Sequence, residues 1–324
     1  IDVMEGVARH WGYRNIPTRE LTEPRSGGLT SHQKARRGMR RLLAGLGLAE
    51  ALPLPFLAPG DLERCGLPAA GIELLNPLVA EESILRTSLR PGLVRAVAEN
   101  ASRRLTGVGL FEIGHVFLPP PQGQLLPDER EQVAVVLAGR DAAAAVEVWQ
   151  VIAEQVRAEA PSVANEALPG LHPTRGARCL VAGAAVGVAG EIDPAVLDAF
   201  GIEERVAWVE VDLDALLGGP RRSEAYRQVS RFPSSDIDLA FEVPDTVSAV
   251  DVQRTIESAD PLVWSVDLFD TYRGDQVAPG TRSLAYRIRL QADDRTLTDA
   301  EVASVRDRLV EAVRTGNGAT LRGG

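Results

Sequence analysis

Lysine is almost missing from this sequence, and long hydrophobic runs are missing altogether. Among 35 basic residues only Lys34 is a lysine, so nearly every positive charge is a guanidinium, which suits planar contacts with phosphate or carboxylate. Charge or proline interrupts each apolar stretch before the roughly 20 residues that a membrane helix requires, and no basic start precedes an apolar signal region. These absences predict a cytoplasmic protein that makes no membrane contact.

Cysteine is also scarce, and histidine is scattered. Cys65 and Cys179 lie far apart without CxxC spacing, which argues against a disulfide framework or a zinc site and predicts two buried thiols. The four histidines form no HxH or HExxH pattern. The formal net charge of -10 disfavours general nucleic-acid binding, so any RNA contact has to come from a local patch.

The sequence contains enough hydrophobic residues to form the cores of two or three folded domains. It has 324 residues, of which 45% are hydrophobic and 25% charged. The chain begins at Ile1, without methionine and in a helical pattern, so we expect a fragment of a longer protein.

Local patterns predict the domain organisation. Residues 1–20 read as the helical tail of a preceding domain, because Gly12, Asn15 and Pro17 end the first helix. Residues 21–217 read as a mixed α+β domain with mostly antiparallel strands. Residues 218–228, which contain Gly-Gly-Pro-Arg-Arg, read as a linker to a last domain at 229–324.

The last domain has the clearest periodicity. Apolar residues alternate with polar ones in two strands, at 236–243 and 283–291, and a third strand is expected at 264–270. Thr298 and Glu301 have capping-box spacing at the start of a helix. The predicted order βαββαβ is the ferredoxin-like arrangement.

Several motifs in chain order resemble the family of bacterial phenylalanyl-tRNA synthetase β subunits, which are class II aminoacyl-tRNA synthetase components. The blocks RFPSSDIDLAF, FDTYRG, SLAYRIRLQ and DRTLTDAEV resemble its ferredoxin-fold anticodon-binding domain. Upstream, NPL, LRTSLRPG, LFEIGHVF and GVAGEIDP resemble its catalytic-like domain, and DVMEGVARHWGYRNIP resembles the end of its DNA-binding-like domain. The resemblance therefore implies a class II synthetase-like antiparallel sheet domain followed by a ferredoxin-like βαββαβ domain.

The resemblance also implies a function. Members of the family support a catalytic α subunit in an α2β2 tetramer, which uses ATP to attach phenylalanine to tRNA(Phe). Leu110 and Phe111 precede Glu112 in the position where a class II site needs an arginine for ATP, so we expect no catalytic residue and no ATP-holding guanidinium in the middle region. The family's editing region would lie upstream of this chain.

A magnesium contact is the first candidate site. Asp2 and Glu5, one helical turn apart, match two positions of a carboxylate set that in the family shares Mg²⁺ with α. Gly6 stands where another glutamate is usual, so the match is incomplete. The alternative is a solvated helix start.

RNA contact is the second candidate. By the resemblance, Arg231, Tyr272, Arg273, Arg287 and Arg289 are candidate tRNA-binding residues, through phosphate contact or base stacking. Cross-strand ion pairs with Asp236 and Asp238 would compete for Arg287 and Arg289, and Tyr272 could instead pack on a turn.

Two further features stay open. The basic helix at 34–41 favours a subunit interface over an RNA surface, and Ser88 is expected in a structural turn because no base is placed near it in sequence. The alternatives to the synthetase reading are a non-enzymatic assembly domain and a small-molecule regulatory module. The absence of glycine from Pro244-Asp245-Thr246 disfavours the regulatory module.

Overall fold

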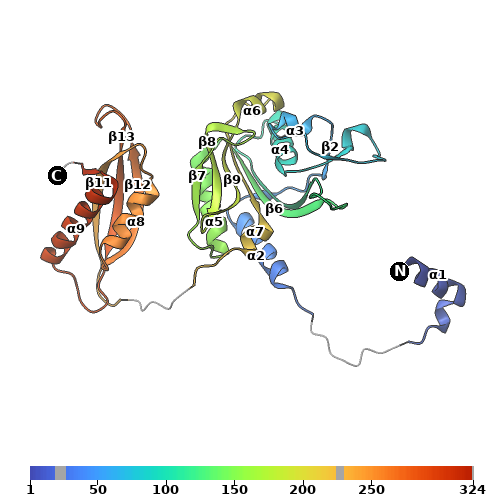
Figure 1. The fold of residues 1–324 in the computed structure, drawn as a ribbon, viewed down its shortest axis with the longest axis horizontal. Coiled ribbons are helices and arrows are strands. Elements are labelled where there is room, and N and C mark those ends of the chain that lie inside the picture. The colour runs from blue at the N-terminus through green and yellow to red at the C-terminus, as the bar shows by residue number, and fades with distance from the viewer. Residues whose placement is uncertain (19–26, 224–229, 323–324) are drawn as a thin grey trace. The chain divides into compact units, whose positions relative to one another are not determined.

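A computed structural model describes residues 1–18, 27–223 and 230–322 of the chain. The chain divides into two compact units, Ile1–Ser223 and Glu224–Gly324 (Figure 1). The predicted domain limit at residues 20 and 21 and the predicted linker residues 224–228 lie outside the described residues. No described helix is long and apolar enough to cross a membrane.

The first unit carries most of the helices. Its described helices are α1 (Asp2–Trp11), α2 (Ser31–Gly45), α3 (Asp61–Arg64), α4 (Arg90–Ser102), α5 (Ala142–Gln155), α6 (Pro194–Phe200) and α7 (Leu213–Gly218), with 3-10 turns η1 (Tyr13–Asn15) and η2 (Ala80–Glu82). Asp141 caps α5 and Asp193 caps α6 through side-chain oxygens that accept backbone N–H groups.

A seven-stranded sheet organises this unit, in the order β1-β5-β6-β10-β9-β8-β7. All its pairs are antiparallel except β1 with β5. A separate small sheet, β2-β4-β3, is formed by strands that lie between β1 and β5 in the sequence. The strands are β1 (Ala49–Glu50), β2 (Phe56–Leu57), β3 (Ile72–Glu73), β4 (Ile84–Leu85), β5 (Gly109–Leu118), β6 (Asp128–Ala138), β7 (Ser162–Asn165), β8 (Leu171–Val181), β9 (Ala184–Ile192) and β10 (Val206–Asp212).

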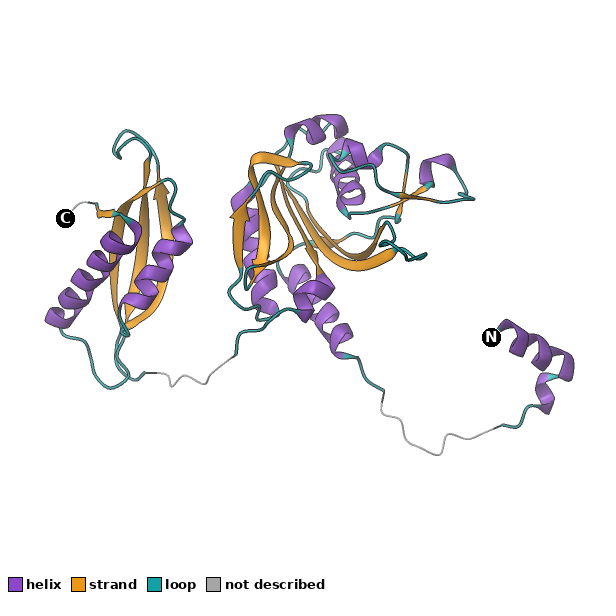
Figure 2. Ribbon diagram, viewed as in Figure 1, coloured by secondary structure: helices purple, strands orange, loops and turns teal. Residues whose placement is uncertain are grey.

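Helices cover both faces of the large sheet, as Figure 2 shows. One core contains residues of α2, α5 and α7 against one face, with Trp149 as its largest side chain. The other contains residues of α4 and α6 against the opposite face, with Trp208 of β10 at its centre. Because side chains alternate along a strand, β10 contributes to both cores and is buried throughout residues 206–211.

The second unit is a four-stranded antiparallel sheet, β12-β13-β11-β14, with two helices packed on one face. Its elements are β11 (Ser235–Pro244), α8 (Ala249–Ala259), β12 (Val263–Tyr272), β13 (Thr281–Leu290), α9 (Asp299–Asn317) and β14 (Thr320–Leu321). The ferredoxin-like order predicted from the sequence is confirmed.

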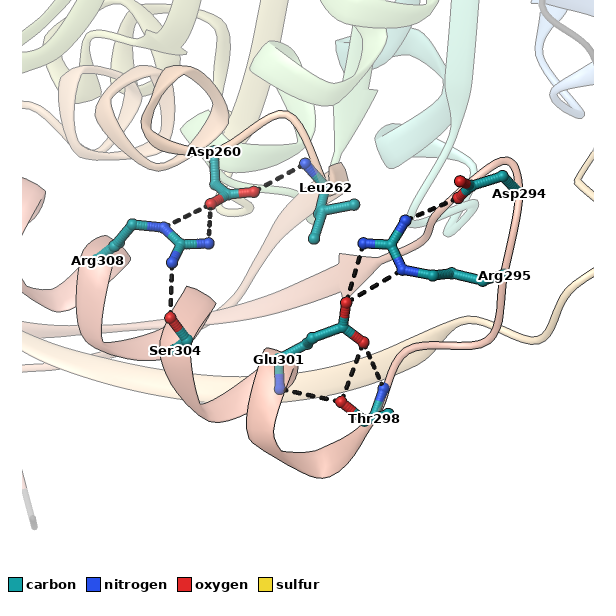
Figure 3. A network of polar contacts seen from close by, with 8 residues as sticks. All are labelled: Asp260, Leu262, Asp294, Arg295, Thr298, Glu301, Ser304 and Arg308. Carbon is teal, nitrogen blue, oxygen red and sulfur yellow. Dashed lines mark hydrogen bonds and ion pairs between the residues drawn. The ribbon is translucent and has the colours of Figure 1, made fainter.

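Polar contacts fix both helices of this unit at their ends (Figure 3). The Thr298 hydroxyl accepts the Glu301 N–H at 3.3 Å, and the Glu301 carboxylate accepts the Thr298 N–H at 2.9 Å, so the predicted capping box is present. The Thr298 N–H and the Arg295 guanidinium lower the pKa of Glu301 to about 2. Buried Asp260, at the end of α8, accepts the Arg308 Nε–H of α9 at 2.7 Å.

The first unit differs from the sequence prediction in detail. Within residues 51–57 only Phe56–Leu57 forms a strand, since Pro53 and Pro55 remove backbone donors. α4 begins at Arg90, within the LRTSLRPG motif, with Pro91 in its first turn. The short helices α6 and α7 were not predicted. Both cysteines are free and buried, as expected.

Candidate functional site

The second unit has an open face, which we define as the side of its sheet opposite α8 and α9. Register and alternation place on it polar and small side chains, whereas the other face is apolar. The open face includes Asp236, Asp238, Ala240 and Glu242 of β11, Ser265, Asp267, Asp270 and Tyr272 of β12, Ala285, Arg287 and Arg289 of β13, and Thr320 of β14.

Two cross-strand ion pairs lie on the open face. Arg287 donates to both carboxylate oxygens of Asp238, at 3.0 and 2.9 Å, and Arg289 pairs with Asp236 in the same way, at 2.8 and 3.0 Å. Hydrogen bonds from these guanidiniums lower the pKa values of the two aspartates. Both pairs are half-exposed, so they orient the guanidiniums more than they stabilise the fold. The ion-pair alternative considered from the sequence is therefore what the structure shows.

Aromatic rings on β12 contact two guanidiniums. The Arg322 guanidinium carbon lies 5.2 Å from the centroid of the Tyr272 ring, and that of Arg287 lies 5.3 Å from the centroid of Phe269. Both distances are within the range of cation–π contacts. Sequence reasoning missed Phe269 and Arg322. Phe269 is the first residue of the FDTYRG motif, but the direction of its side chain depends on an irregularity in strand pairing.

The other predicted tRNA-binding residues lie away from the centre of the open face. Arg273 follows β12 and donates to Asp245 at 2.9 Å, in the connection between β11 and α8. Arg231 is exposed in the loop before β11. The structure thus brings Tyr272, Arg287 and Arg289 onto one face and leaves Arg231 and Arg273 outside it.

The first unit has a cavity of about 410 Å³ beside the start of α4, lined by both apolar and charged residues. Glu210 is one of its lining residues, and the carboxylate accepts the Ser88 hydroxyl at 2.8 Å and the Leu89 N–H at 2.7 Å. Burial raises the pKa of Glu210, and the Arg90 guanidinium opposes that rise. The Ser88 hydroxyl is therefore hydrogen-bonded to Glu210 at the N-terminus of α4, as expected for a residue in a structural turn. No histidine is among the residues that line this cavity.

Three arginines line the same cavity, which the sequence did not lead us to expect. Each of them is engaged within the chain. Arg90 donates to the Pro169 carbonyl at 2.8 Å, Arg130 is 2.7 Å from Asp128, and Arg178 is 2.8 Å from Glu166. Residues far apart in sequence bring these arginines together, whereas the sequence-based expectation concerned only guanidiniums able to hold ATP. Their pairing leaves none of the three without a partner.

A second buried pair supports the LRTSLRPG turn. Arg86 Nη1 lies 2.7 Å from Glu112 Oε1, and Arg86 Nε donates to the His115 carbonyl at 2.8 Å. Burial raises the pKa of Glu112 to about 6, although Arg86 pulls it down. The turn is thus held by buried polar contacts on both sides of Ser88.

Asp2 and Glu5 lie in the first turn of α1, and both are exposed. Within the described residues, no group of three or more His, Cys, Asp or Glu side chains could hold a metal ion. Two carboxylates one turn apart fit a magnesium ion that keeps several waters, provided that another chain supplies further ligands.

Comparison with known proteins decides the family. The family described as phenylalanyl tRNA synthetase beta chain CLM domain matches residues 16–213, and the ferredoxin-fold anticodon binding domain matches residues 230–322. This chain belongs to the phenylalanyl-tRNA synthetase β-chain family. The resemblance indicated by the sequence motifs is confirmed, and the second unit is the family's anticodon-binding domain.

The curated relatives of this chain are named as subunits of phenylalanine–tRNA ligase. The phenylalanine–tRNA ligase beta subunit of Geobacillus kaustophilus is 36% identical over 345 residues, which cover 99% of this chain and 42% of that protein. That of Thermobifida fusca is 36% identical over 367 residues, covering 99% of this chain and 44% of that protein. The chain thus spans about two fifths of the length of these curated relatives.

Similarity to solved structures is weaker. Pyrrolysyl-tRNA synthetase from Desulfitobacterium hafniense is 12% identical with a TM-score of 0.49, covering 58% of this chain and 68% of that one. A similarity at this level does not establish a class II architecture for the first unit.

Proposed function

We propose that this chain is part of a phenylalanine–tRNA ligase β subunit, which supports a catalytic α subunit and binds the anticodon region of tRNA(Phe). The assembly would be an α2β2 tetramer that acts in the cytoplasm and uses ATP. The observation that carries the proposal is the match of the second unit to an anticodon-binding domain, combined with its exposed open face. Oriented guanidiniums, the exposed Phe269 ring and the half-buried Tyr272 ring on that face suit unpaired RNA bases.

Residues 21–217 would form a class II synthetase-like scaffold without catalysis of its own. The ion pairs of Arg130 with Asp128 and of Arg178 with Glu166 support this, because the carboxylates offset guanidinium charge that a triphosphate would need. Magnesium shared with α through Asp2 and Glu5 belongs to the same proposal. In this chain those residues would supply carboxylate oxygens to the ion.

Binding of tRNA tests the anticodon role. The full subunit, assembled with α, should retain tRNA(Phe) on a filter at fixed salt, and the same assembly lacking residues 230–324 should bind it more weakly. Equal retention by both assemblies would refute an RNA-binding role for the second unit.

Adenylate formation tests the scaffold role. Without α, this chain should catalyse no phenylalanine-dependent exchange of pyrophosphate into ATP. Exchange above background would show that the first unit holds a working active site.

A specific observation also favours a second candidate, a pure assembly domain. Ion pairing on the open face neutralises Arg287 and Arg289, which weakens attraction to phosphate. The filter experiment separates the two candidates, since an assembly domain predicts that truncation alters subunit association and leaves intrinsic tRNA affinity unchanged.

A further inference from the structure

Phe269 is an exposed aromatic ring at an irregularity of β12. Leu268 pairs with Tyr286 and Asp270 pairs with Ala285, so residue 269 has no partner on β13 and forms a bulge. Bulges redirect a side chain out of the normal alternation. The Phe269 side chain is 53% exposed, whereas Phe241, on the helix-covered face of the same sheet, is fully buried.

The Arg287 guanidinium lies against this ring and is held in place from the other side. Its carbon is 5.3 Å from the ring centroid, while two hydrogen bonds tie the same group to Asp238. Bidentate pairing fixes the plane of the guanidinium as well as its position. The neighbouring Arg289 has the same kind of bidentate pairing, with Asp236.

The charge of the open face decides which part of an RNA suits this pair. Carboxylates outnumber guanidiniums there: Asp236, Asp238, Glu242, Asp267 and Asp270 stand against Arg287, Arg289 and Arg322. Because its net charge is negative, such a face has little electrostatic attraction for a phosphate backbone. A flat, neutral nucleobase can stack on an exposed ring or on a guanidinium plane without charge repulsion from the carboxylates.

We propose that Phe269, with Arg287 fixed by Asp238, forms a stacking site for one unpaired nucleobase of the bound RNA. This inference rests on the proposed anticodon-binding function and adds a contact separate from Tyr272. Phe269 and Tyr272 are three residues apart on β12, which is at most roughly 10 Å at strand spacing. A base that lies flat on one of these rings is displaced from the other, so the two rings would hold two different bases.

The test measures tRNA(Phe) affinity of the full subunit assembled with α, at two salt concentrations. Phe269→Ala should weaken binding about 5- to 150-fold, the range for loss of one stacked base. The dependence of affinity on salt should stay unchanged, because no phosphate contact is removed. Phe269→Trp should bind within about threefold of the wild type, since it keeps an aromatic surface.

Two controls make the result specific. Phe269→Leu keeps an apolar side chain without a π-system and should bind like Phe269→Ala. Val250→Ala removes an exposed apolar side chain from α8, on the other face of the sheet, and should bind like the wild type. Thermal unfolding should be the same for all variants that are compared.

The outcomes separate this inference from the proposed function. If Phe269→Ala binds as tightly as the wild type while removal of residues 230–324 abolishes binding, the stacking site is refuted and the anticodon role stands. A changed salt dependence in Phe269→Ala would also refute stacking. If neither change affects affinity, the proposed RNA-binding function itself fails.

Discussion

Replacing Glu112 with glutamine should change how the stability of the first unit depends on pH. Glu112 is 2% exposed, and burial raises its pKa from 4.5 to about 6 despite the neighbouring Arg86. A carboxyl group with a higher pKa in the folded state binds its proton more tightly when folded. Its contribution to stability is therefore complete below about pH 4.5 and is lost as the pH rises through 6.

The magnitude follows from the rise in pKa. At about 1.4 kcal/mol per pKa unit, a rise from 4.5 to about 6 corresponds to about 2 kcal/mol. Glutamine has no proton to lose, so Glu112→Gln removes this dependence. The free energy of unfolding of the variant, minus that of the wild type, should increase by about 2 kcal/mol between pH 4 and pH 7 and then level off.

Urea unfolding at a series of pH values provides the assay. Trp149 and Trp208, each at most 1% exposed, report on the two cores of the first unit by fluorescence. Glu166→Gln is the matched control, because Glu166 is exposed and its hydrogen bond to Arg178 lowers its pKa. For this control, the free energy of unfolding of the variant minus that of the wild type should stay constant above pH 4.5. A flat or falling difference for Glu112→Gln would refute the assignment of a raised pKa to this buried carboxyl.

Three further predictions concern stability, each measured by urea unfolding. Thr298→Ala removes the capping hydroxyl of α9 and should cost about 1 kcal/mol, and an unchanged midpoint would contradict that role. Tyr286→Phe leaves the Ala249 carbonyl without its 2.8 Å donor and should also cost about 1 kcal/mol; a more stable variant would show that the bond contributes nothing. Gly170→Ala should cost about 1–3 kcal/mol or more, because φ is +68° and the new Cβ would lie 2.2 Å from the Cys65 oxygen; wild-type stability would mean that this close approach relaxes freely.

Strong periodicity explains why the second unit could be predicted closely. In β11 and β13, alternate apolar residues face α8 and α9, and the sequence pattern showed this directly. The capping box at Thr298 and Glu301 is likewise a local signal. In the first unit, β8 and β6 extend well beyond their apolar segments, since pairing with neighbours continues through polar residues such as Arg130.

Contacts between distant segments explain what could not be predicted at the candidate sites. Glu210 meets Ser88 only because β10 and the start of α4 come together, 122 residues apart in sequence. Phe269 reaches Arg287 because the pairing of β12 with β13 skips one residue, which no composition or spacing rule indicates. By contrast, the pairing of Arg287 with Asp238 could be anticipated from the expected neighbouring strands, and it is present.

The two-sided burial of β10 has a consequence for how relatives should be aligned. Trp208 and Glu210 face the α4 side, and Val209 faces the α5 side. Inserting or deleting a single residue within Val206–Asp212 would exchange the two sides and take the carboxylate away from α4. Gaps among homologous sequences should therefore gather in surface turns such as the exposed residues 119–126, and a gap placed within this strand would mark a misalignment.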